Sequence, residues 1–435
     1  MTGRSSMSTG RTSAPDSRYR RLAALLSLAL LGPAFAACGD DDVPVSPDDP
    51  ERYVVEAIER TLHQRARAML NGDSVGFDRS LARRDAAFVE AQDRYYGNVT
   101  QLPLGAVRFT LGTESLEPDG PDGGDGGAYW AEITIRLQIE GYDVAPVVTR
   151  DRWRFVPTAN QRRYLLASTT DRAWEADHPS QPQPWDLDEE IEVRDAPGVL
   201  GIFDDDSLGS ASSVLDAVSL GRFQVKSVLP TELSDPGGVV LYALSDPAFV
   251  DSLSGLPFSD PDRLDGATIP VPRDATDADG RVASYRILLS PHVLDQGEEV
   301  LDRLVRHELT HVALGERAQG VPLWLTEGIA EYVSVQPIAP AERRLQTDAL
   351  NLAASGVDDL PSDADFGGEH AEGWYAVSWW VCEYIAATYG ADALWLLLDA
   401  LHDGGDQASV ISQQLGISTS ALAEQGVALM RRTYG

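Results

Sequence analysis

The spacing of hydrophobic residues changes from a helical period to a strand period near residue 100. Apolar positions recur every three or four residues over 51–70, which predicts an amphipathic helix that stops at Asn71-Gly72. Two shorter helical segments, 75–81 and 85–96, come next. A period of two then predicts strands at 107–111, 128–139, 144–156 and 164–168. This order predicts an α+β unit over residues 51–175, in which helices precede a curved antiparallel sheet.

The second half of the chain has a different pattern. Pro179, Pro182 and Pro184 mark a boundary ahead of Trp185. Helical spacing dominates from residue 298 onward. Between them, short apolar runs predict strands at 198–203, 238–244 and 285–290 and helices at 208–220 and 247–253. We therefore predict a second α+β unit, residues 186–435, with a helical C-terminal part.

Element order in residues 51–175 resembles the cone-shaped SnoaL-like, or nuclear-transport-factor-like, fold. The resemblance rests on that order, without a diagnostic motif. Such cones either house ligands or mediate contacts, so the resemblance implies no function. The Asp-, Gly- and Pro-rich run 118–127 is expected to be the solvated tip of a hairpin, because it has no calcium-ligand spacing.

The first 37 residues are typical of an export signal. Three arginines precede the apolar run 22–31, and small residues follow as far as Cys38. The apolar run is too short to span a bilayer. Phe-Ala-Ala-Cys, which ends at Cys38, resembles the lipobox of bacterial lipoproteins; this implies an extracytoplasmic protein with a lipid anchor on Cys38. The alternative is a plain cleaved signal ending near Ala37. The acidic, proline-rich stretch 38–50 is expected to be a linker.

Charge and cysteine content exclude several functions. The 435 residues include 35 Lys and Arg against 68 Asp and Glu, a net charge of −33. Such a field repels phosphate backbones, so we expect no nucleic-acid partner. The two cysteines, Cys38 and Cys382, exclude a disulfide framework. Cys382 lies in an apolar stripe and is expected to be a small buried residue.

Two short motifs carry the candidate chemistry. Residues 307–311 read His-Glu-Leu-Thr-His within a helically spaced segment. His307 and His311 are therefore one turn apart on one helix face and can reach a single Zn²⁺. Glu308 lies beside such a metal without binding it, where it can act as a general base on water. The alternative is a pair of buried core histidines.

The second motif, Trp-Leu-Thr-Glu-Gly-Ile-Ala-Glu-Tyr, starts at Trp324 after a turn that would begin a new helix. It supplies Glu327 and, one turn later, Glu331; the alternative for both is an exposed acidic helix face. Two histidines and one carboxylate would leave a fourth zinc position open, as in catalytic sites. Glu331 is placed to accept a hydrogen bond from a liganding imidazole.

Together the motifs resemble the gluzincin metallopeptidases, in particular the bacterial peptidase-MA-like group. The resemblance implies that His307, His311 and Glu327 bind zinc and that Glu308 is the base. It also implies a tyrosine that assists the oxyanion, and Tyr375 is the position that resembles it.

Alternatives remain open around this site. Tyr375 could be a core aromatic, and His370 is the competing donor. In such peptidases an exposed edge strand borders the cleft and pairs with an extended substrate. The strand at 285–290 is expected to be either this edge strand or a buried one.

We therefore expect a zinc metallopeptidase acting on a peptide or protein substrate. Two other functions remain open. One is a binding or scaffolding lipoprotein whose zinc domain is structural or silent, although a structural site needs no base such as Glu308. The other is zinc-dependent hydrolysis of a non-peptide amide or ester by the same residues.

Overall fold

The computed structural model describes residues 50–120, 127–178, 182–233, 237–245, 249, 265–274 and 280–434. The predicted signal and lipid site, the linker as far as residue 49, Pro179, the loop tip at 121–126 and most of the helix at 247–253 lie outside the described residues. The described chain from residue 50 onward belongs to one unit by its internal contacts.

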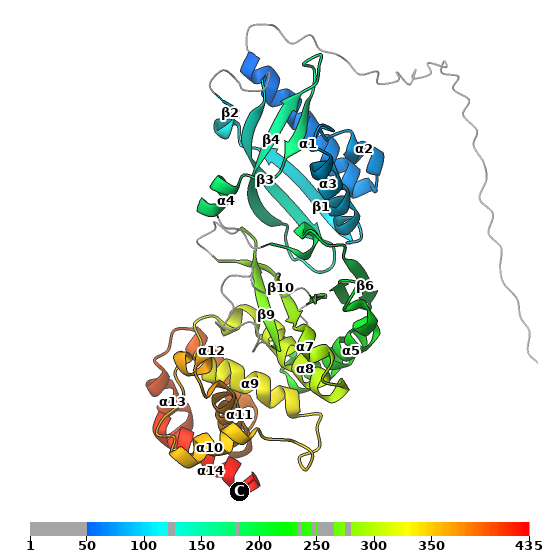
Figure 1. The fold of residues 1–435 in the computed structure, drawn as a ribbon. Coiled ribbons are helices and arrows are strands. Elements are labelled where there is room, and N and C mark those ends of the chain that lie inside the picture. The colour runs from blue at the N-terminus through cyan, green and yellow to red at the C-terminus, as the bar shows by residue number, and fades with distance from the viewer. Residues whose placement is uncertain are drawn as a thin grey trace, which may run out of the picture. The chain divides into compact units, whose positions relative to one another are not determined.

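Three helices precede a curled antiparallel sheet in the first part of the described chain (Figure 1). The helices are α1 (Pro50–Asn71), α2 (Ser74–Asp78) and α3 (Ala86–Val99). The strands are β1 (Leu104–Leu111), β2 (Glu117–Pro118), β3 (Tyr129–Ile139), β4 (Val147–Pro157) and β5 (Tyr164–Ser168), followed by α4 (Arg172–Asp177). They pair in the order β1-β3-β4-β5, with β2 beside β3. The predicted helices and strands of this region are confirmed, with bounds shifted by a few residues at most positions.

Helix α1 packs its apolar stripe against this sheet. Val54, Ile58 and Leu62 are at most 5% exposed, and they share a core with alternate sheet residues such as Ile133 and Phe155. The helix ends as predicted because Gly72 takes a φ of +63°, a conformation that glycine adopts without strain.

A second sheet follows, in the order β6-β7-β8-β10-β9. Its strands are β6 (Glu192–Ala196), β7 (Val199–Phe203), β8 (Val239–Ala243), β9 (Gly266–Pro272) and β10 (Val282–Leu289), with helix α5 (Ala211–Val228) between β7 and β8. The three central strands are parallel, and the two outer ones are antiparallel to their neighbours. Leu241 and Ile287 pack into the helical core, whereas Val240 and Leu288 join the core of α1 and the first sheet. Both faces of the central strands are therefore buried, which explains their continuous apolar runs.

One alternative for the strand at 285–290 is wrong. Residues 285–289 lie within β10, which pairs with β8 on one side and β9 on the other, so the segment is the buried strand and not the edge. The outer strand beside β10 is β9, and the outer strand at the other edge is β6; the sequence pattern predicted neither. The buried residues of β9 alternate regularly, but Pro270 and Pro272 occupy positions between them, and a proline in a run argues against a strand when only the sequence is read. Prolines are tolerated at sheet edges because they lack an N–H to donate.

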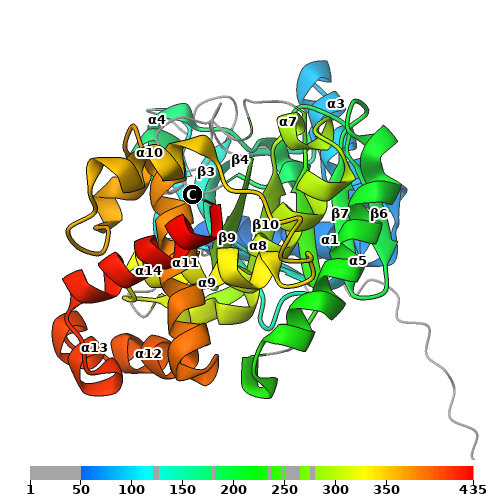
Figure 2. The same ribbon diagram turned by 90° about the horizontal axis from the view of Figure 1, so that it is seen from below.

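The C-terminal part is helical, as predicted. It contains α7 (Pro291–Leu294), α8 (Glu298–Leu314), α9 (Leu323–Val335), α10 (Thr347–Ser355), α11 (Ala371–Tyr389), α12 (Asp392–His402), α13 (Gln407–Leu415) and α14 (Thr419–Tyr434). Figure 2 shows α11 between α9 and α14, and α11 packs against both of them. Among the described residues no single helix is long and apolar enough to cross a membrane; α11 and α12 meet that test only as a pair, and the chain bends by 117° between them.

Candidate metal centre

Helix α8 carries the first motif, and its packing against α5 determines which way the motif faces. Val305 and Leu309 are buried on the α5 side of the helix. The two helices are so close that a Cβ atom on Gly221 would lie 3.0 Å from Leu309 Cδ1. His307 and His311 project from a different face, toward α9.

Helix α9 brings the second motif to the same place because it packs tightly on α11. A Cβ atom on Gly328 would lie 2.7 Å from the Ser378 carbonyl oxygen and 2.8 Å from Cys382 Sγ, so only glycine fits at this contact. Cys382 is fully buried there, as predicted. With Gly328 fixed against α11, the neighbouring Glu327 reaches the histidines of α8.

Three donor atoms converge between α8 and α9. His307 Nε2 lies 3.1 Å from His311 Nε2, and Glu327 Oε2 lies 3.2 Å from each of them. All three side chains are less than one-fifth exposed. The structure thus brings together the three residues predicted to be metal ligands.

These separations fit a single metal ion. Ligand atoms about 2.0–2.1 Å from a tetrahedral zinc ion lie about 3.3 Å apart. The observed spacings of 3.1–3.2 Å are close to this value. The cluster could therefore hold a metal ion, and three protein donors leave a further tetrahedral position for water or substrate.

Glu331 contacts the far side of one ligand. Its Oε1 lies 3.2 Å from His307 Nδ1, and its Oε2 accepts a 2.5 Å hydrogen bond from Arg303 Nη2. Burial alone would raise the pKa of Glu331, but the Arg303 guanidinium and the His307 ring outweigh it and hold the pKa at about 2. Burial lowers the pKa of His307, yet hydrogen bonds to Glu327 and Glu331 raise it well above its ordinary value. Glu331 is therefore an anion that faces Nδ1 of the His307 ring.

Glu308 is buried beside the donor cluster and is not one of its members. The Thr268 hydroxyl, from strand β9, lies 2.7 Å from Glu308 Oε2 and 3.0 Å from the Glu308 carbonyl oxygen. The carboxylate thus lies on the side of α8 that faces the edge strand of the second sheet.

Tyr375 also lies beside the cluster. Its ring centroid is 6.4 Å from that of His307 and 5.1 Å from that of Phe366. Burial and the nearby carboxylates, Glu327 first, raise the pKa of Tyr375 far above its ordinary value, so the phenol keeps its proton. The competing donor His370 is 55% exposed and lies 3.4 Å from Asp348, so the described contacts favour Tyr375.

Two site residues were missed by sequence reasoning. Arg303 precedes His307 by four residues on the same helix, so helical spacing could have indicated it. Thr268 lies 40 residues before Glu308, in a strand that was not predicted, and no local pattern connects the two.

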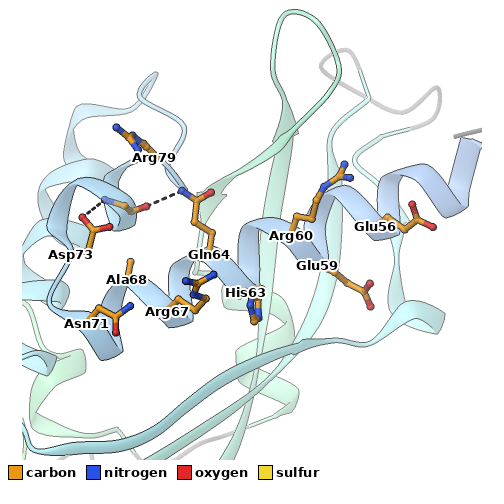
Figure 3. Close-up of a pocket in the computed structure, with 11 residues that line it drawn as sticks. Glu56, Glu59, Arg60, His63, Gln64, Arg67, Ala68, Asn71, Asp73 and Arg79 are labelled. Carbon is orange, nitrogen blue, oxygen red and sulfur yellow. Dashed lines mark hydrogen bonds between the residues drawn. The ribbon is translucent and has the colours of Figure 1, made fainter. Parts of the chain in front are cut away.

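A separate hollow lies along the outer surface of α1 and α2 (Figure 3). Its volume is about 590 Å³. Acidic, basic and neutral polar side chains line it, among them Glu59, Arg60, His63 and Arg67. Asp73 there caps α2 by accepting from the Gly76 N–H. The hollow shares no residue with the metal centre.

Comparison with known proteins assigns the chain to no family, so any function must be inferred from the site. No protein-family model matches the sequence, and no curated protein matches it significantly.

Proposed function

We propose that this chain is a zinc-dependent metallopeptidase. The observation that supports the proposal is the convergence of His307, His311 and Glu327 beside a buried carboxylate, Glu308, that is not itself a donor. Two imidazoles and one carboxylate are a donor set that zinc accepts, with a position left for chemistry. Bound there, zinc would polarise a peptide carbonyl and acidify water.

Each neighbouring side chain then has a distinct task. Glu308 takes the proton of the attacking water as the water oxygen bonds to the carbonyl carbon, and passes it to the amide nitrogen when the C–N bond breaks. Tyr375, a protonated phenol, donates a hydrogen bond to the carbonyl oxygen as negative charge develops on it. Glu331 accepts from His307 Nδ1 and keeps Nε2 free for the metal.

The place of action is proposed from sequence alone. The N-terminal signal pattern and Cys38 support an exported protein anchored to a membrane by a lipid. Peptide or protein substrates would then meet the enzyme outside the cytoplasm.

Glu308→Gln is the variant that tests this proposal. Glutamine preserves shape but cannot accept the proton, so the variant should retain about one zinc per chain and lose hydrolysis of unfolded casein by at least about a hundredfold. Metal content is measured by elemental analysis alongside casein cleavage.

Glu299→Gln, in the exposed first turn of the same helix, is the matched control and should behave like the wild type. Equal cleavage by wild type and Glu308→Gln would exclude the proposed base. Zinc in both with cleavage in neither would instead favour a binding or scaffolding role.

A further inference from the structure

Strand β9 packs along helix α8, and strand residues two apart meet helix residues four apart. A Cβ atom on Gly266 would lie 3.1 Å from Leu304 Cδ2, and Thr268 contacts Glu308. Two residues of a strand advance about 6.6 Å, and four residues of a helix advance about 6 Å. The contact between Thr268 and Glu308 therefore follows from the packing of the strand on the helix.

The Thr268 hydroxyl has a single hydrogen and two acceptors within reach. One is the Glu308 carbonyl oxygen at 3.0 Å, and the other is Glu308 Oε2 at 2.7 Å. The carbonyl lies within α8, where the N–H four residues later is its ordinary partner. The carboxylate oxygen is closer and, when ionised, accepts a stronger bond. The hydrogen is therefore expected on Oε2.

We propose that Thr268 is a positioning residue for Glu308: its hydroxyl fixes one carboxylate oxygen and so presents the other to the reacting water. This inference rests on the proposed function. A carboxylate held at one oxygen cannot rotate freely about its terminal bond, and its second oxygen keeps a fixed direction. Small displacements of a reacting group reduce turnover strongly, so loss of the Thr268 hydroxyl is expected to lower kcat.

A purely structural role makes a different prediction. If Thr268 only filled space between β9 and α8, valine, which has nearly the same shape, would replace it without loss. If the hydroxyl is what matters, Thr268→Ser keeps the function and Thr268→Val loses it. Neither substitution changes a metal donor, so zinc content is expected to remain that of the wild type.

The test compares the wild type, Thr268→Val and Thr268→Ser by steady-state cleavage of a fluorogenic peptide, by zinc content and by crystal structures of the metal-free proteins. Thr268→Val should lower kcat about tenfold to a hundredfold, the range for a lost hydrogen bond to a charged group, with KM unchanged. Thr268→Ser should stay within about threefold of the wild type. In the Thr268→Val crystal, the Glu308 carboxylate should leave its position.

Three results would overturn the inference: full kcat in Thr268→Val, an equal loss in Thr268→Ser, or an unmoved carboxylate in the Thr268→Val crystal. A wild type that cleaves no peptide would refute the proposed function instead. The crystal structures would still decide whether the hydroxyl positions Glu308.

Discussion

At the scale of single residues, the two ring nitrogens of His307 face different partners. Nε2 lies 3.2 Å from Glu327, and Nδ1 lies 3.2 Å from Glu331. A neutral imidazole binds a metal through one nitrogen and donates a proton from the other, so in the proposed zinc site Glu331 would select the tautomer with its proton on Nδ1. Arg303 in turn forms an ion pair with the Glu331 carboxylate, whose side chain is 16% exposed.

Glu331→Gln should therefore weaken zinc binding without abolishing it. The amide still fits but carries no charge to strengthen the imidazole as a ligand, and loss of such partners typically costs about 10–100-fold in metal affinity. Competition with a chromophoric chelator measures the change in Kd.

The control for this prediction is again Glu299→Gln, which leaves the surroundings of His307 intact. An unchanged Kd in Glu331→Gln would show that the contact with Nδ1 does not support the metal site.

The metal donors could be predicted from the sequence because they lie in short motifs with helical spacing. His307 and His311 are one helical turn apart, and Glu327 and Glu331 are likewise one turn apart, so period alone places each pair on one face. Thr268 and Glu308 meet only because a strand packs on a helix, and such a contact has no signature in either segment.

At the scale of elements, ion pairs join the turn between β3 and β4, and β4 itself, to β10 and to the residues that follow β9. Asp143 accepts a 2.5 Å bond from Arg286 of β10, and this ion pair is almost completely buried. Arg150 of β4 pairs with Asp274, just after β9, and the two side chains are 36% and 26% exposed. The first sheet thereby holds the end of the strand that carries Thr268.

Asp143→Ala should destabilise the protein by about 3–5 kcal/mol, because it leaves the Arg286 guanidinium buried without its partner. Asp274→Ala, in the same contact region, should cost about 1 kcal/mol or less, because water screens the more exposed pair. Urea unfolding gives both free energies. Equal losses in the two variants would mean that burial does not determine the strength of these contacts.

The elements were predicted unevenly. Long periodic segments such as α1 and β3 were found nearly residue for residue, because burial on one side imposes a clear period. β6 and β9 were missed, and the sequence left open whether the strand at 285–290 is an edge strand or a central one. Strand order depends on pairings between distant segments, which hydrophobic spacing does not encode.

At the scale of the whole molecule, the second sheet lies between two hydrophobic cores. One core contains α1 and the first sheet, and the other contains α8, α9 and α11. Residues 186–435 hold 42 Asp and Glu against 14 Lys and Arg, so most of the negative charge belongs to the part that carries the donors. A field of this sign favours a bound cation, which agrees with a metal centre there.

The central claim is that His307, His311 and Glu327 hold one zinc ion. The most direct measurement is anomalous X-ray diffraction at the zinc edge from crystals of the zinc-loaded protein. We predict one strong peak about 2.0–2.2 Å from His307 Nε2, His311 Nε2 and a Glu327 oxygen. A peak bound by other residues, or no peak at these three donors in zinc-saturated crystals, would contradict the account.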